Sequence, residues 1–391
     1  MGPRSGTSAP RILVASWLKW ISAARVASAL TSAGARVDAV FPPLHPLQSV
    51  TGLNGRHDFS EAQPSTSLRC AIEASQPDLI VAGDDVAVDD LMRLRLHAGG
   101  PIADLIDRSL GSAGAFETLR SRTRLIRLAQ EEDVLAPATE EIATADALVD
   151  WLAAHGAPAF VKLDGAFGGN GVRLIADATD ARALFADVTA TTPPDDAPRE
   201  AGRPTTPVVS VQRAIDGRPA NCGFFSWQGE VLGLVGVEVL KTIKPFGVAT
   251  VVRIIEHPMM KQAAVRIARR LQLTGLHGLD FMIEAATGDA WLIEMNGRPT
   301  PISHLRLGPG RDLPGAIMSA LGARPTAFDA GLADGAVIAL FPHMLKERPS
   351  PAPRDSMRDI PWNQPGLIGS ILPAHKLALP LFREAMHRLL A

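Results

Sequence analysis

Three oxygen-bearing side chains, Asp280, Glu294 and Asn296, stand in two apolar segments that a short turn separates. The segments, LDFMIE and WLIEMN, predict two strands of a hairpin. Residues two apart in a strand face the same side, so Glu294 and Asn296 share a face, and the turn brings Asp280 beside them. Charges in apolar strands are costly unless they are paired or bound to a metal. Hard oxygen ligands in this number favour Mg²⁺, or Mn²⁺, shared with nucleotide phosphates, and the alternative is a solvated face of the hairpin.

A lysine and a glycine-rich loop form a second candidate site in the stretch FVKLDGAFGGNGVRLI, residues 160–175. Glycines allow positive φ angles and let the backbone approach a ligand closely. Amide groups that converge in such a loop can bind phosphate oxygens, and Lys162 adds a positive charge. The segment lacks the Gly-Lys-Ser/Thr of a P-loop, so an ordinary hairpin or surface loop is the alternative.

The elements that must position these residues begin with strand–helix–strand alternation, which predicts an N-terminal parallel sheet. We expect strands at 11–16, 35–42 and 78–85, and helices at 20–33 and 65–75. One charged amphipathic helix is expected at 116–132 and another near 144–155. Antiparallel strands follow the polar, proline-rich segment 189–207, and a helix at 257–271 precedes the hairpin. The sequence therefore predicts an α/β region followed by an α+β region.

The composition narrows the class of protein. A chain of 391 residues with 46% hydrophobic residues is long enough for two or three domains. The formal net charge of −2 gives no large electrostatic footprint for nucleic acid. Cys70 and Cys222 match no disulfide framework or zinc spacing, which fits a reducing compartment. No stretch approaches the length of a membrane span, so we expect a soluble, cytoplasmic protein.

The motifs LIEMNGRP, residues 292–299, and VKLDGAFGGNGV, residues 161–172, together resemble the ATP-grasp superfamily. The resemblance runs from about residue 116 to 310. It implies a parallel-sheet pre-ATP-grasp domain at 1–115 and a two-part ATP-grasp domain at 116–310. The lid-bearing part would be 116–207 and the metal-binding part 208–310, with a C-terminal extension at 311–391.

The resemblance implies roles for individual residues toward ATP. Lys162 matches the lysine near the α- and β-phosphates, and Arg122, in SRTRLI, matches a second phosphate-contacting cation. The glycines that match the mobile loop over the phosphates are Gly168, Gly169 and Gly171. The stretch VSVQRAIDG fits the hinge that meets adenine, which places Gln212, Arg213 and Ile215 along the base. Many members carry a carboxylate where this chain has Gln212. The position after the hinge that often holds a ribose-binding acid is not clearly filled in the local sequence RPANC, so the orientation of the nucleotide there stays open.

The resemblance also implies the metal ligands and the anion-binding arginine. Glu294 and Asn296 match the paired ligands of Mg²⁺, and Asp280 matches a third ligand position that varies within the superfamily. Arg298 matches the arginine that faces the transferred phosphate and the acyl substrate.

The activity that the resemblance implies is ligation of a carboxylate to an amine, with ADP and phosphate released. Small amino-acid or peptide-like substrates are expected. The alternatives are a carboxylase or carbamoyl-phosphate-type enzyme that uses bicarbonate, a regulatory nucleotide-binding module and a structural protein. Lys241, Lys244 or Arg253 could bind a substrate carboxylate, and Asp84 or Asp85 could bind a ligand or cap a helix. His304 could line the acceptor site or be packed, and the tail from 321 could cap the domain or mediate dimerisation.

Overall fold

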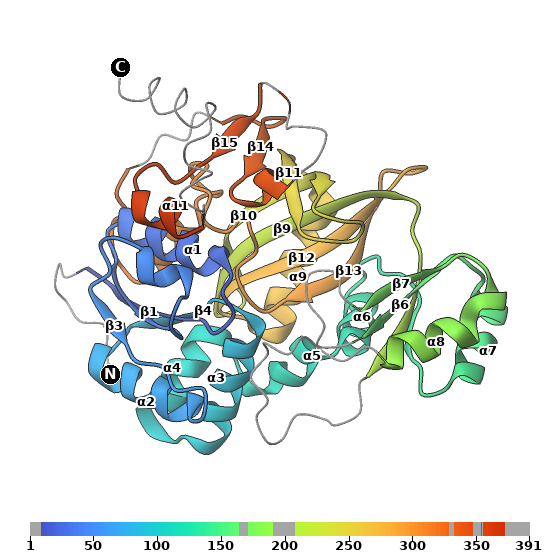
Figure 1. Ribbon diagram of the computed structural model, residues 1–391, viewed down its shortest axis with the longest axis horizontal. Helices are drawn as coiled ribbons and strands as arrows, with labels where there is room; N and C mark the ends of the chain where they lie inside the picture. The colour runs from blue at the N-terminus through green and yellow to red at the C-terminus, as the bar shows by residue number, and fades with distance from the viewer. Residues whose placement is uncertain are drawn as a thin grey trace.

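The computed structural model describes residues 9–163, 171–190, 208–327, 332–346, 353 and 355–371. The strands of this part of the chain form three sheets, and Figure 1 shows them as separate layers along the long axis of the molecule. The layer that contains α7 (Ala145–His155) and α8 (Ala181–Ala190) lies at the end opposite the N-terminal sheet (Figure 1).

The N-terminal sheet is parallel and has the order β3-β2-β1-β4. Its central strands are short apolar runs with buried side chains, as expected for a sheet covered on both faces. The strands are β1 (Arg11–Ala15), β2 (Arg36–Val40), β3 (Gly55–His57) and β4 (Leu79–Ala82). The helices are α1 (Ile21–Ser32), α2 (Pro64–Ser75), α3 (Asp85–His97) and α4 (Gly100–Leu110). The predicted strands, helices and parallel pairing are confirmed to within a few residues.

The predicted single helix at 116–132 is wrong, because the chain forms two helices there. They are α5 (Phe116–Arg120) and α6 (Arg122–Glu131). Ser121 has extended backbone angles, and its hydroxyl accepts a hydrogen bond from the Arg124 amide. Serine is a good N-cap, so α6 starts afresh at this residue.

A small antiparallel sheet has the order β5-β8-β6-β7. Its strands are β5 (Thr139–Glu141), β6 (Ala159–Leu163), β7 (Val172–Ile175) and β8 (Val209–Arg213). Two helices, α7 (Ala145–His155) and α8 (Ala181–Ala190), pack with it around a separate core that includes Trp151 and Val161. Val161 and Val211 face this core, which leaves the alternate residues Lys162 and Gln212 for the other face.

The large sheet has seven strands in the order β13-β12-β9-β10-β11-β14-β15. Its long strands are β9 (Gly217–Trp227), β10 (Glu230–Thr242), β11 (Ala249–Ile254), β12 (Gly275–Glu284) and β13 (Ala290–Asn296). Helix α9 (Pro258–Leu271) covers one face through a core that includes Ile267 and Phe281. The predicted hairpin is therefore present at one edge of this sheet.

The C-terminal region continues the large sheet. β14 (Val337–Leu340) pairs with β11, and β15 (Met357–Asp359) pairs with β14. The final described helix is α11 (Pro365–Ile371), and Trp362 is partly buried against the core. The domain boundaries at 115 and 310 stay a prediction.

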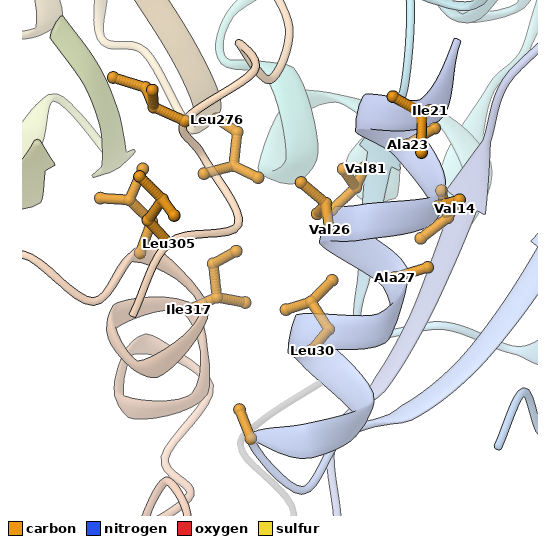
Figure 2. Close-up of a cluster of buried hydrophobic side chains, with 14 of the residues drawn as sticks. Val14, Ile21, Ala23, Val26, Ala27, Leu30, Val81, Leu276, Leu305 and Ile317 are labelled. Atoms are coloured by element: carbon orange, nitrogen blue, oxygen red, sulfur yellow. The ribbon is translucent and has the colours of Figure 1, made fainter. Parts of the chain in front are cut away.

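One hydrophobic core joins the N-terminal sheet to the large sheet. Figure 2 shows Val26 and Leu30 of α1 facing Ile317 of α10 (Leu313–Ala320), with Leu276 and Leu305 nearby. All five side chains are buried. This shared core holds the N-terminal sheet against the large sheet, whose edge hairpin carries the candidate metal ligands. Among the described helices, none has the length and apolarity needed to cross a membrane.

Candidate active site

The structure brings Asp280, Glu294 and Asn296 together on the β12–β13 hairpin. Asp280 is directly opposite Glu294, and the Asn296 Nδ2 donates to Asp280 Oδ2 at 2.9 Å. Asn221 on β9 is opposite Asp280 on the other side, and its Nδ2 donates to Asp280 Oδ1 at 2.5 Å. Asn221 was missed, because only the pairing of β9 with β12 places it there.

The two carboxylates repel each other electrostatically. Burial and the charge of Glu294 raise the pKa of Asp280 to about 6. Burial alone would also raise the pKa of Glu294, but the charges of Arg122 and Lys162 lower it. A divalent cation between the carboxylates would relieve this repulsion, so the donor set fits Mg²⁺.

Protein carboxylates alone would not complete a metal site here. The described residues contain no cluster of three or more His, Cys, Asp or Glu side chains that could hold a metal ion. A cation would therefore need the Asn296 amide oxygen and oxygens from a substrate. The roles of all three residues as ligands stay a prediction.

Lys162 and Gln212 connect the small sheet to the hairpin. The Lys162 Nζ donates to Gln212 Oε1 at 2.6 Å, and both residues are buried. The Gln212 Nε2 donates to Thr139 Oγ1 at 3.0 Å and to the Ile293 carbonyl at 3.2 Å. Gln212 thus orients the lysine and ties the small sheet to β13, immediately before Glu294.

Arg122 is a second cation beside Glu294. Its Nη2 lies 3.2 Å from Glu294 Oε2, and its Nη1 donates to Ser210 Oγ at 3.3 Å. Arg122 begins α6, so the Ser121 cap that breaks the predicted helix also sets the position of this arginine. The site therefore combines a carboxylate pair with two cations from other elements.

The remaining residues predicted to bind ATP are only partly described. Gly171 has a φ of 72°, whereas Gly168 and Gly169 lie outside the described residues. The Arg213 guanidinium lies 5.3 Å from the centre of the Trp291 ring, and Ile215 is buried. The Arg213 backbone amide already donates a hydrogen bond to the Ala138 carbonyl within the protein. Contact between the hinge residues and adenine stays a prediction.

Arg298 lies where the hairpin meets the N-terminal sheet. Its Nε donates to Asp85 Oδ2 at 2.6 Å, and its guanidinium lies 4.6 Å from the centre of the Trp20 ring. Asp84 caps α3, because its carboxylate accepts a hydrogen bond from the Ala87 amide. Asp85, by contrast, faces the candidate site. Trp20 was missed, since no local pattern marks it.

The other candidate substrate residues have partners elsewhere. Arg253 pairs with Glu238 at 3.2 Å, and Arg218 contacts the same carboxylate at 3.0 Å. His304 is packed, because it is buried and its Nε2 lies 2.9 Å from Asp359 Oδ2. Lys241 lies near the end of β10, and Lys244 follows in the turn to β11.

Solved structures of enzymes share the overall fold of this chain. Biotin carboxylase from Campylobacter jejuni matches with a TM-score of 0.61 and 14% identity, over 84% of this chain and 75% of that one. N5-carboxyaminoimidazole synthetase from Staphylococcus aureus matches with a TM-score of 0.60 and 12% identity, over 83% and 81%. The biotin carboxylase domain of 2-oxoglutarate carboxylase from Hydrogenobacter thermophilus, with MgADP and bicarbonate, matches with a TM-score of 0.62 and 14% identity, over 84% and 73%. The sequence matches no protein-family profile and no curated protein.

These structural relatives are members of the ATP-grasp superfamily, and they cover 83–84% of this chain. The resemblance read from LIEMNGRP and VKLDGAFGGNGV is confirmed at the level of the fold. This chain has the ATP-grasp fold.

Proposed function

We propose that the protein is an ATP-dependent, ADP-forming ligase that activates a carboxylate for attack by an amine. The observation that carries the proposal is that two cations from other elements, Arg122 and Lys162, act on the Glu294 carboxylate. Arg122 lies 3.2 Å from this carboxylate, and Lys162 is held by Gln212, which also contacts β13. A carboxylate pair flanked by cations suits a nucleotide phosphate with its divalent metal ion.

ATP and Mg²⁺, or Mn²⁺, are the proposed cofactors. Asp280, Glu294 and Asn296 would hold the metal ion, and Lys162 and Arg122 would contact the phosphates. When bound, the metal ion would neutralise charge on the β- and γ-phosphates. The relatives support this assignment, because one was solved with MgADP and the Staphylococcus enzyme was also solved with ADP.

The chain's own residues then provide the chemistry of carboxylate activation. Arg298 would bind the substrate carboxylate, whose oxygen attacks the γ-phosphorus and displaces ADP, giving an acyl phosphate. The amine attacks the carbonyl carbon of this intermediate, loses a proton and displaces phosphate. Arg298, Lys162 and Arg122 would stabilise the negative charge that develops on phosphate and carbonyl oxygens.

A bicarbonate-using reaction is the second candidate. The relatives with similar folds include biotin carboxylases and N5-carboxyaminoimidazole synthetases, and one of them was solved with bicarbonate. Bicarbonate would take the place of the carboxylate at Arg298. A regulatory module without turnover is less favoured, because Asp280, Glu294, Asn296 and Arg298 are all present.

The test is ADP release from Mg·ATP in the presence of amino-acid pools, with and without hydroxylamine, and separately with radiolabelled bicarbonate. Glu294→Gln is the test variant. Glu284→Gln is its matched control, because Glu284 lies on the same hairpin and contacts Thr287 and Trp291 instead. We expect Glu294→Gln to lower ADP release by about 100-fold or more and the control to retain it.

The outcomes separate the candidates. A pool-dependent hydroxamate would support carboxylate activation, whereas incorporation of label with an amine would support the bicarbonate reaction. Mg·ADP binding with no ADP release under any of these conditions would favour the regulatory module over the ligase.

A further inference from the structure

The N-terminal domain holds the Arg298 side chain from two directions. Asp85 accepts a hydrogen bond from Nε at 2.6 Å, and the Trp20 ring covers the guanidinium at 4.6 Å. The Arg298 side chain is only 13% exposed. A guanidinium with so little exposure needs a counter-charge, because an unpaired charge removed from water is strongly destabilising.

Asp85 and Trp20 both lie at the carboxyl end of the parallel sheet, in a corner formed by residues 16–20 after β1 and 84–87 after β4. Asp84 organises this corner, since its carboxylate accepts hydrogen bonds from the Ser16 hydroxyl and from three backbone amides. Two of those amides, from Trp17 and Leu18, fix the loop that leads to Trp20. The third lies in the first turn of α3, which begins with Asp85.

The contacts leave one edge of Arg298 available. Its Nε donates to Asp85 and its Nη1 to the Pro299 carbonyl at 3.3 Å. Within the described part of the chain, Nη2 contacts no hydrogen-bond acceptor. The charge of Arg298 also acts on Asp280, so the guanidinium lies within electrostatic reach of the carboxylate pair.

We propose that Asp85 and Trp20 are positioning residues, which hold Arg298 by its Nε edge and its face so that Nη2 meets the substrate anion. This inference rests on the proposed function, because it assumes that Arg298 binds the carboxylate or bicarbonate. The N-terminal domain is then part of the reaction site, and its docking on the large sheet sets the orientation of the arginine. A side chain held in this way loses little freedom on binding the anion.

The first measurement does not need the substrate. The Nε–H resonance of Arg298 is recorded in protein labelled with ¹⁵N-arginine and is assigned by its loss in Arg298→Lys. Asp85→Asn should shift this resonance and speed its exchange with water by roughly tenfold, because the charge-assisted hydrogen bond is lost. Trp20→Ala should also shift the resonance, because the ring is lost. In Trp20→Phe the resonance should lie close to its position in the unmodified protein, because a ring is again present.

Asp107→Asn is the matched control for the resonance. It removes an aspartate that pairs with Arg95 at 2.6 Å in the same domain, with no contact to Arg298. In the Asp107→Asn variant the Arg298 resonance should stay unchanged. An Arg298 resonance that does not respond to Asp85→Asn or to Trp20→Ala would overturn the proposal, whatever the activity.

The second measurement uses the ADP-release assay with the pool or bicarbonate that supports turnover in the unmodified protein. Asp85→Asn should lower kcat by roughly tenfold and leave the KM for Mg·ATP within about twofold. The double variant with Arg298→Lys should be no slower than Arg298→Lys alone, because both substitutions remove the same interaction. Additive losses would contradict a positioning role.

The two measurements distinguish the two proposals. If the unmodified protein binds Mg·ADP but releases no ADP under any of these conditions, the ligase function fails, and the resonance alone decides whether Asp85 and Trp20 hold Arg298. If Asp85→Asn does not fold, Trp20→Ala and Trp20→Phe provide both readouts.

Discussion

Asp84 and the Asp280–Glu294 pair are both carboxylate sites, but Asp84 is fully buried, whereas the Glu294 side chain is 37% exposed, and their surroundings differ. Asp84 is surrounded by neutral donors: one hydroxyl and three backbone amides, at 2.6–2.9 Å. Asp280 has two amide donors, but a second carboxylate lies directly opposite it, and cations approach that second carboxylate from two other elements.

The difference teaches how a structural carboxylate can be told from a functional one. At Asp84 every hydrogen bond comes from a neutral donor, and burial is the cause that raises the pKa of this carboxyl. At Asp280 the neighbouring Glu294 adds to the effect of burial. Like charges held together lower stability, and such an arrangement is typical of sites that bind a cation or a reacting group.

The largest expected effect is on stability at the Asp84 corner. Asp84→Ala leaves four buried donors without their acceptor, so the free energy of unfolding should fall by about 4 kcal/mol. Urea unfolding followed by tryptophan fluorescence measures this. Asp78→Ala, which removes an acceptor for the Arg11 amide alone, should cost much less. Equal losses in the two variants would contradict the prediction that the four hydrogen bonds of Asp84 stabilise the fold more than the single one of Asp78.

Acidification should also weaken this corner, through His45. Its Nε2 lies 3.1 Å from Ser16 Oγ, and burial lowers the pKa of its imidazole to about 4. The folded pKa is thus below the unfolded value, so between about pH 6.5 and 4 the unfolded chain binds more protons and stability falls as pH falls. From pH 7 to 5 the loss from His45 is about 2 kcal/mol.

Urea unfolding at both pH values tests this prediction. His45→Gln should lose about 2 kcal/mol less than the unmodified protein on this acidification. His97→Gln, at an exposed position, should follow the unmodified protein. An unchanged pH dependence in His45→Gln would contradict the assignment to His45.

At the candidate active site, removal of a cation should lower nucleotide affinity more than it lowers folding stability. Lys162→Met should weaken Mg·ADP binding by roughly tenfold, since the neutral side chain cannot contact a phosphate. Isothermal titration calorimetry measures the dissociation constant. Lys261→Met, on the exposed side of α9, is the control. Equal affinities in both variants would remove Lys162 from the nucleotide site.

The smallest expected effect is a gain in stability at the Asp280–Glu294 pair, in contrast to the loss expected at Asp84. Asp280→Asn removes the like charge beside Glu294, so the free energy of unfolding at pH 8 should rise by about 1 kcal/mol. The same change should reduce the extra thermal stabilisation that Mg²⁺ adds to ADP binding. Thermal unfolding with ADP, with and without Mg²⁺, measures both effects. A loss of stability in the ligand-free variant would show that Asp280 stabilises the fold, as Asp84 is expected to do.

Local patterns in the sequence were enough for most elements and for part of the site. The apolar segments LDFMIE and WLIEMN, with a turn between them, predicted the β12–β13 hairpin that places Asp280 opposite Glu294. The prediction succeeds here because a hairpin forms between neighbouring segments, and residues two apart in a strand face the same side. The break at Ser121 was missed, because amphipathic spacing continues across it and only the backbone shows that the residue is a cap.

The sequence by itself determined the residue types of the site, the hairpin that carries the acidic pair and the parallel sheet before it. Only the tertiary structure decided the partners of these residues: Asn221 for Asp280, Gln212 for Lys162, and Asp85 with Trp20 for Arg298. Asp85 is 213 residues from Arg298 in the sequence. Such a pair forms only when the shared core of α1, α10 and the large sheet docks the N-terminal domain, and no local spacing encodes that docking.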